Sequence, residues 1–315
     1  MTEADTPLGL LVNTKQQYPF YYEHISRSVS EGKSPTDAAL LYAASCCGME
    51  LSAASLAAAR LGACYMWQQS KRMYVFDETL AQTLLEQAED MLKAERLPVE
   101  GLSELPGSAF YVKAPDLIAK GLDGFFVWAE EAVPGNCVLQ FAFLHDDLQT
   151  CTGGCLTLTG SLQEALPDPD AWVFPYIVRA AHQDARALKV VLCYTDPGGP
   201  MRHMIHNLLL RAVQLVIYVC CENADIEPSQ GSGPDAKGED GLRFKAITVG
   251  RNIGSALRKA AEVSGKARKA HTRRGHWHSY WVGPKNGDRR LITKWVAPVF
   301  VGSKIADVDV IVISD

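Results

Sequence analysis

Residues 108–160 read "SAFYVKAPDLIAKGLDGFFVWAEEAVPGNCVLQFAFLHDDLQTCTGGCLTLTG", and this stretch decides the fold class. It contains four short runs rich in aromatic and β-branched residues, separated by glycine, proline, asparagine and aspartate. Such runs favour strands, and short connections with turn residues favour antiparallel neighbours. The stretch therefore predicts an antiparallel meander with strands at 108–114, 124–131, 137–147 and 154–160.

Before this sheet, residues 1–104 are expected to form a helical region. The run Ser34-Pro35-Thr36-Asp37 has the composition of a helix start, and the alanine-rich residues 49–69 follow it. Residues 77–95 carry leucines at helical spacing, and Asp77 is placed to cap the first turn.

After the meander, residues 161–222 are expected to form helices with one strand at 189–195, which completes a central unit of residues 105–222. Residues 223–241 are rich in proline, glycine and acids, which predicts a flexible linker or loop. Residues 242–315 form a basic C-terminal unit with a strand at 243–250. The predicted fold class is α+β, with a helical N-terminal half, a central antiparallel sheet, and a basic C-terminal helix plus β-hairpin.

The composition predicts a folded, water-soluble protein. Of 315 residues, 47% are apolar and 21% are charged. No apolar run reaches the roughly 18–20 residues that a membrane helix needs, and the first residues lack the features of a signal peptide. The nine cysteines have no scaffold spacing, which predicts buried free thiols in a reducing compartment. We therefore expect a cytoplasmic protein with no membrane partner and no cofactor.

Charge is distributed unevenly along the chain. Residues 251–294 contain twelve Lys or Arg residues and two acids, a net charge of +10, whereas the whole chain carries −5. The remainder of the chain therefore carries −15. A basic segment beside an acidic body predicts either a polyanionic partner or charge pairing within the molecule.

Three of the eight histidines lie inside this basic segment, in the run "HTRRGHWHSYWVGP" of residues 271–284. Asn286-Gly287 follows, and this pair is typical of a two-residue type I′ hairpin turn. Such a turn would pair residues whose numbers sum to about 573, so that Trp295 would lie opposite His278. Alternation along the strand would place His276, His278 and Tyr280 on one face.

Four interpretations of this cluster remain open: a metal site, a pair of catalytic histidines, a nucleic-acid surface, and a purely structural hairpin. Neither an acid nor a cysteine lies close enough in sequence to complete a metal site, and no catalytic residue is assigned. Arginine, lysine, histidine and aromatic residues together favour binding of phosphates and bases. The candidate residues for binding a partner or RNA are His271, Arg273, Arg274, His276, Trp277, His278, Tyr280, Trp281, Lys294 and Trp295.

The same run resembles the C-terminal signature of a type V-A anti-CRISPR family. The resemblance rests on "HTRRGHWHSYW-G" at residues 271–283 and on "KWVAPVFV" at residues 294–301. Upstream, "GRNIGSALRK" is similar to the glycine-containing helix of that family. "LPGSAFYVKAP", "GLDGFFVWAEE" and "LLRAVQLVIYVCCENADI" are similar to its central strands and its apolar helix.

The resemblance implies an inhibitor that blocks biogenesis of the type V-A CRISPR effector nuclease. Family members recognise the N-terminal segment of the effector as it emerges during translation, and the effector mRNA is then lost. The implied partners are this nascent peptide and the ribosome or mRNA, in the cytoplasm of the bacterial host. A non-enzymatic protein is favoured over an enzyme. The alternative is a phage or plasmid protein that binds RNA, or cleaves it without metal, through the histidine-rich hairpin.

Overall fold

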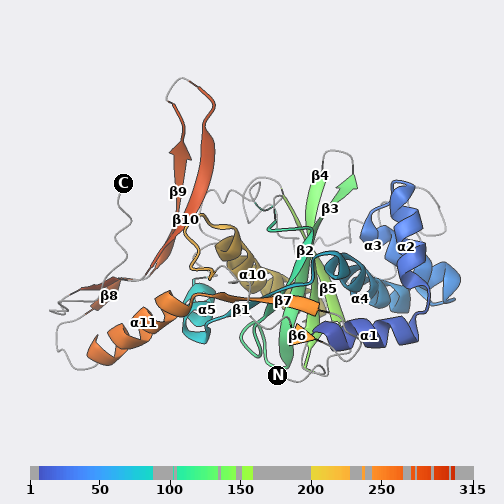
Figure 1. Ribbon diagram of the computed structural model, residues 1–315, viewed down its shortest axis with the longest axis horizontal. Coiled ribbons are helices and arrows are strands. Elements are labelled where there is room, and N and C mark those ends of the chain that lie inside the picture. The colour runs from blue at the N-terminus through green and yellow to red at the C-terminus, as the bar shows by residue number, and fades with distance from the viewer. Residues whose placement is uncertain are drawn as a thin grey trace.

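The computed structural model describes residues 7–87, 102, 105–133, 136–146, 151–158, 200–227, 236–237, 243–264, 271–273, 275–284, 287–297 and 299–301. Helices cover both faces of a central sheet, and a two-stranded hairpin rises from one side of the body (Figure 1). No helix in the described part of the chain combines the length and the apolar character that crossing a membrane requires.

The predicted antiparallel meander is confirmed. Each of its strands pairs in antiparallel fashion with the next, and they are β2 (Ala109–Lys113), β3 (Leu122–Val133), β4 (Asn136–His145) and β5 (Cys151–Thr157).

The sheet also extends beyond the meander, through β1 (Arg72–Phe76), β7 (Arg243–Val249) and β6 (Ala236–Lys237). The order across the sheet is β5-β4-β3-β2-β1-β7-β6. Strand β1 is parallel to both of its neighbours, β2 and β7. The α+β fold class is confirmed, and the central sheet is mixed because of β1, which lies inside the region that the sequence predicts to be helical.

Both faces of the sheet are buried, and this explains the apolar runs of its strands. On β3, Phe125 and Val127 belong to one core, whereas Phe126 and Trp128 belong to the core on the opposite face. Strands covered on both faces are apolar without strict alternation.

The core that contains Phe126 and Trp128 is covered by the N-terminal helices, which are α1 (Pro7–Gln17), α2 (Tyr21–Ser30), α3 (Pro35–Leu41), the π-helix η2 (Tyr42–Cys46) and α4 (Leu51–Ser70). The predicted helix start is confirmed, since the Ser34 side chain accepts a hydrogen bond from the backbone N–H of Asp37 at 3.1 Å. Helix α4 lies close to β5, where a Cβ added to Gly153 would be 2.9 Å from Cβ of Ala59.

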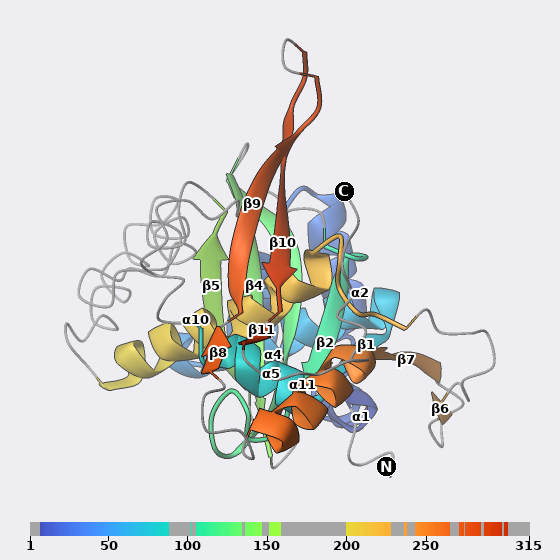
Figure 2. The same ribbon diagram turned by 90° about the vertical axis from the view of Figure 1, so that its left-hand side faces the viewer.

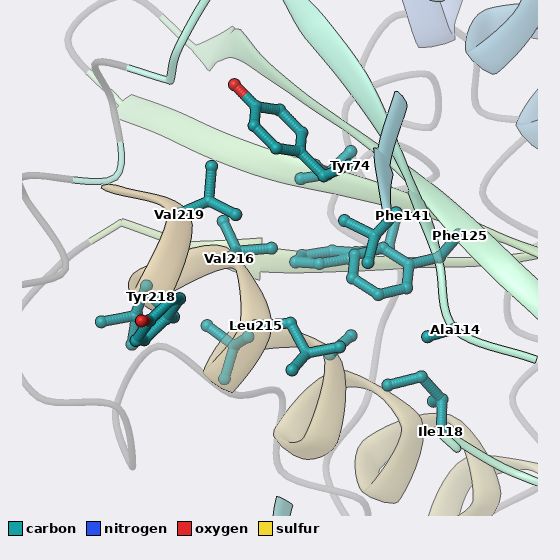
Figure 3. Packing of buried hydrophobic residues seen from close by; sticks show 14 of the residues in the cluster. Tyr74, Ala114, Ile118, Phe125, Phe141, Leu215, Val216, Tyr218 and Val219 are labelled. Atoms are coloured by element: carbon teal, nitrogen blue, oxygen red, sulfur yellow. The ribbon is translucent and has the colours of Figure 1, made fainter. Parts of the chain in front are cut away.

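The core that contains Phe125 and Val127 is covered by α5 (Glu78–Leu85) and α10 (Pro200–Cys220). Figure 3 shows Leu215, Val216 and Val219 of α10 facing Phe125 and Phe141 of the sheet. The predicted cap of α5 is confirmed, since Asp77 accepts hydrogen bonds from two backbone N–H groups of the first turn. Helix α5 ends at Leu85 and Gln87 lies in a turn, whereas residues 88–95 of the predicted helix and the elements predicted for residues 161–199 lie outside the described residues.

Helix α11 (Arg251–Ser264) is fixed at its N-terminus and along one side. The carboxylate of Asp225 accepts hydrogen bonds from the backbone N–H groups of Asn252 and Ile253 at 2.8 and 2.9 Å. Gly254 lies so close to Asp77 that an added Cβ would be 2.7 Å from Oδ2 and closer still to Oδ1. The glycines of "GRNIGSALRK" therefore permit close helix packing.

Beyond α11 come two antiparallel strand pairs. One is β8 (His271–Arg273) with β11 (Val299–Val301), and the other is the hairpin of β9 (His276–Val282) and β10 (Arg290–Val296). Figures 1 and 2 show the β9–β10 hairpin standing away from the helices and the sheet, with its base near α10.

Candidate interaction surface

The hairpin forms as predicted, but its predicted register is wrong by one residue. Trp277 pairs with Trp295 and His278 pairs with Lys294, so the numbers of paired residues sum to 572. The strands end at Val282 and Arg290, and the positive φ lies at Gly283 (126°), whereas Gly287 has no positive φ. A type I′ turn needs positive φ at both central residues, so a longer connection replaces it. Asn286 lies outside the described residues.

One face of the hairpin anchors it to the body. Trp295 is 2% exposed, its Nε1 donates to Oε1 of Gln87 at 3.1 Å, and its ring meets Tyr218 edge-on at 5.7 Å. On the facing strand, Nε1 of Trp277 donates to Oε1 of Gln214 at 3.2 Å. Both indole N–H groups therefore have partners, as buried tryptophans require.

The backbone of β10 is held as well. Asn223 donates from Nδ2 to the carbonyl oxygen of Trp295 at 2.9 Å, and its Oδ1 accepts from the N–H of the same residue at 3.3 Å. Gln214, which donates from Nε2 to the carbonyl oxygen of Leu210, lies in the apolar helix α10 and is fully buried. The polar residues that interrupt this helix are thus attachment points, since Arg211 likewise donates to two carbonyl oxygens of residues 117–118.

The other face is exposed and carries a ladder of rings. His276, His278 and Tyr280 lie along β9, as predicted. The rings of His276 and His278 have centroids 6.4 Å apart, and those of His278 and Tyr280 stack at 4.2 Å with an interplanar angle of 29°. On β10, Lys294 lies opposite His278 and places Nζ 5.9 Å from the centre of the Tyr280 ring.

The outer end of the hairpin is also exposed. Trp281 lies on the same face of β9 as Trp277, but its side chain is 52% exposed, and Val282 is 40% exposed. Arg289 is exposed on the far side of the connection. Aromatic and cationic side chains are therefore accessible at the outer end of the hairpin.

Two predicted residues lie at the base. His271 and Arg273 lie in β8, where their backbones pair with Val301 and Val299, and Arg274 lies outside the described residues. The predicted candidates thus separate into Trp277 and Trp295, which contact the body, and the exposed His276, His278, Tyr280 and Trp281 with the half-buried Lys294. Among the described residues, no three His, Cys, Asp or Glu side chains cluster as ligands for a metal ion.

A second feature, which sequence reasoning missed, is a small cavity between helices α3 and α4 and strands β3, β4 and β5. Its volume is about 60 Å³, and its lining is mainly apolar, comprising Thr36, Leu40, Ser55, Ala58, Ala59, Trp128, Gln140, Phe141, Gly153, Gly154 and Cys155. Burial raises the pKa of the Cys155 thiol to about 12, so this group stays protonated. The sequence feature that could have indicated this cavity is its small residues, Gly153-Gly154 and the alanines of α4.

A buried carboxylate lies beside this cavity. Glu130 is 6% exposed, and its Oε2 accepts hydrogen bonds from the backbone N–H of Thr36 at 3.2 Å and from Nε1 of Trp128 at 3.1 Å. Its Oε1 accepts from Nε2 of Gln140 at 3.2 Å. The carboxylate therefore ties the start of α3 to the sheet and holds the polar groups at the cavity wall in place.

The comparisons with known proteins agree with this architecture. A model of the AcrVA2-like family, the anti-CRISPR type V subtype A2 family, matches residues 74–303. No curated protein matches the chain. The crystal structure of AcrVA2 has a similar fold, with a TM-score of 0.56 and 17% sequence identity, over 93% of this chain and 97% of that chain. Because the family model spans well over half of the sequence, the resemblance is confirmed, and the chain belongs to the AcrVA2-like family of type V-A anti-CRISPR proteins.

Proposed function

We propose that this anti-CRISPR protein recognises the N-terminal segment of the type V-A effector nuclease during translation and thereby causes loss of the effector mRNA. The observation that carries the proposal is the family match over residues 74–303. The protein would act in the cytoplasm of the bacterial host, and recognition would require a peptide-binding surface but no catalytic residue.

The cavity beside α4 is the best candidate for the peptide-binding surface. Recognition sites are concave and mostly apolar, with a few polar groups that fix the orientation of the ligand. Here the small side chains of Ala58 and Ala59 leave the space, and Thr36 and Gln140 supply the polar groups. A single apolar side chain of an extended peptide is the ligand that suits this volume and lining.

The proposal is tested by co-expression with reporters. One reporter fuses the native N-terminal segment of the effector, a second encodes the same residues with synonymous codons, and a third encodes altered residues. Message loss with the first two reporters, and none with the third, is the expected result. Equal loss from all three would refute recognition of the peptide.

The role of the cavity is tested separately by filling it. Ser55 lines the cavity, whereas Leu56 is 58% exposed on the same helix and is not among the lining residues. Ser55→Leu is expected to abolish loss of the native reporter message, and Leu56→Ala is the matched control that should retain it. Full activity of a folded Ser55→Leu protein would remove the cavity from the proposal.

A metal-independent ribonuclease is the second candidate, since His276 and His278 are exposed on one face with ring centroids 6.4 Å apart. Two histidines within reach of one phosphate could act as acid and base. Purified protein incubated with RNA in EDTA distinguishes the two functions. Cleavage that His276→Ala abolishes would establish the ribonuclease, and intact RNA would exclude it.

A further inference from the structure

We propose that the exposed face of the β9–β10 hairpin binds single-stranded RNA. We call this face, made of His276, His278, Tyr280 and Lys294, the ring face. The choice of RNA over DNA rests on the proposed function, because a protein that acts on a translated message meets RNA. Binding itself is inferred from the geometry of the hairpin.

The spacing of the rings fits stacking with unpaired bases. Alternate residues on a strand recur about every 6.6 Å and point to the same face, so β9 presents three rings in a row. His278 and Tyr280 already stack on each other at 4.2 Å, so no base fits between them, and an unpaired base would extend this stack from outside. Bases of single-stranded RNA stack on aromatic and histidine rings that a sheet presents in this way.

The facing strand supplies a cation at the centre of the ladder. Lys294 pairs with His278 across the hairpin and places its ammonium group 5.9 Å from the centre of the Tyr280 ring. A base stacked on Tyr280 or His278 would bring its phosphate within reach of this ammonium. Ile292 and Val296, opposite Tyr280 and His276, complete an apolar floor between the rings.

The ring face is available because the opposite face performs the structural role. Trp277 and Trp295 attach the hairpin to the body through hydrogen bonds to Gln214 and Gln87. Within the described part of the chain, no hydrogen bond or ion pair to the body involves His276, His278 or Lys294. The accessible rings therefore lie on an arm that projects from the body (Figure 2).

The local charge favours a polyanion. Residues 251–294 carry a net charge of +10. Arg251 and Arg258 of this segment are already paired with Glu227 and Asp77, so the remaining cations, including Lys294, supply the attraction. Three rings beside a cation favour nucleic acid over an acidic protein surface. Stacking requires unpaired bases, which favours single strands over duplexes.

The experiment measures binding of purified full-length protein to a fluorescent, unstructured RNA of about 12 nucleotides, within the usual site size of single-strand binders. Anisotropy is recorded between about 50 and 200 mM salt, where phosphate contacts lose affinity steeply. Tyr280→Ala is expected to weaken binding roughly 5- to 150-fold, the loss of one stacked base. Lys294→Ala should weaken binding and lower the salt slope by about one.

Lys15→Ala is the matched control, since it removes one exposed positive charge from α1, at a distance from the hairpin. It should bind RNA like the unmodified protein. The inference is overturned if no RNA binds at low salt, if Tyr280→Ala binds normally, or if duplex RNA, single-stranded DNA or an acidic peptide binds at least as tightly. The assay contains no effector peptide and no ribosome, so its failure would leave the reporter test of peptide recognition unaffected.

Discussion

Replacing Gly254 with alanine tests how α11 is held against the body. An added Cβ would lie 2.7 Å from Oδ2 of Asp77 and closer still to Oδ1. This carboxylate caps α5 through the backbone N–H groups of Thr79 and Leu80 and also accepts from Arg258 at 2.8 Å. The new methyl group would therefore displace the Asp77 side chain, which caps α5 and binds Arg258 of α11.

The expected magnitude follows from these contacts. Displacing Asp77 loses an N-cap, about 1 kcal/mol, and overpacking adds roughly 1–3 kcal/mol. The half-exposed ion pair with Arg258 contributes at most a few tenths of a kcal/mol. Alanine regains about 1 kcal/mol through its better helix propensity. We therefore expect Gly254→Ala to lower the free energy of unfolding by about 2 kcal/mol, or the melting temperature by roughly 3 °C.

Thermal unfolding followed by circular dichroism measures this change. Ser255→Ala, one position further along α11, is the control and should stay within about 0.5 kcal/mol of the parent protein. In the double variant Asp77→Ala/Gly254→Ala the obstructing carboxylate is gone. The free energy of unfolding of the double variant should therefore be little lower than that of Asp77→Ala alone. A Gly254→Ala protein as stable as its parent, or full additivity in the double variant, would refute the close-packing explanation.

Three further outcomes are expected. Trp295→Phe removes the donor to Gln87 and leaves a buried acceptor unpaired, so thermal unfolding should show a loss of about 1–3 kcal/mol; an unchanged melting temperature would mean that the indole N–H does not anchor the hairpin. Native protein treated with iodoacetamide at neutral pH should be labelled at the exposed Cys46 and Cys47, whereas Cys155, buried and with a pKa raised to about 12, should react only after unfolding, as peptide mass spectrometry can show. Folding raises the pKa of Cys155 from 9.0 to about 12, so the stability linked to its protonated thiol is fully present below pH 9 and is lost as pH rises toward 12. Above pH 9 the melting temperature should therefore fall less steeply with pH in Cys155→Ala than in the parent protein. Equal slopes for the two proteins would contradict this assignment.

Local chemistry made several features predictable. The meander at residues 108–158 was predictable because each strand carries its own β-forming residues and its own turn signals. The caps at Ser34 and Asp77 were predictable because a capping side chain bonds within its own first turn. Alternation along β9 likewise aligned His276, His278 and Tyr280, whichever register the hairpin adopted.

Pairing between distant segments was not predictable in this way. Strand β1 is short and lies in helix-rich sequence, and it becomes a strand between β2 and β7, far away along the chain. The cavity beside α4 was missed for the same reason, since its lining comes from segments spread over residues 36–155.

In the β9–β10 hairpin, some features follow from the local sequence and others depend on tertiary contacts. The sequence by itself determined that two strands pair here and that residues 271–301 carry a family signature, because both follow from neighbouring residues. The tertiary structure decided the register, since burying Trp295 against Gln87 and Tyr218, opposite Trp277, stabilises the observed pairing more than a tight turn at Asn286-Gly287 would. That one-residue difference places Lys294 among the exposed rings and Trp295 in the core.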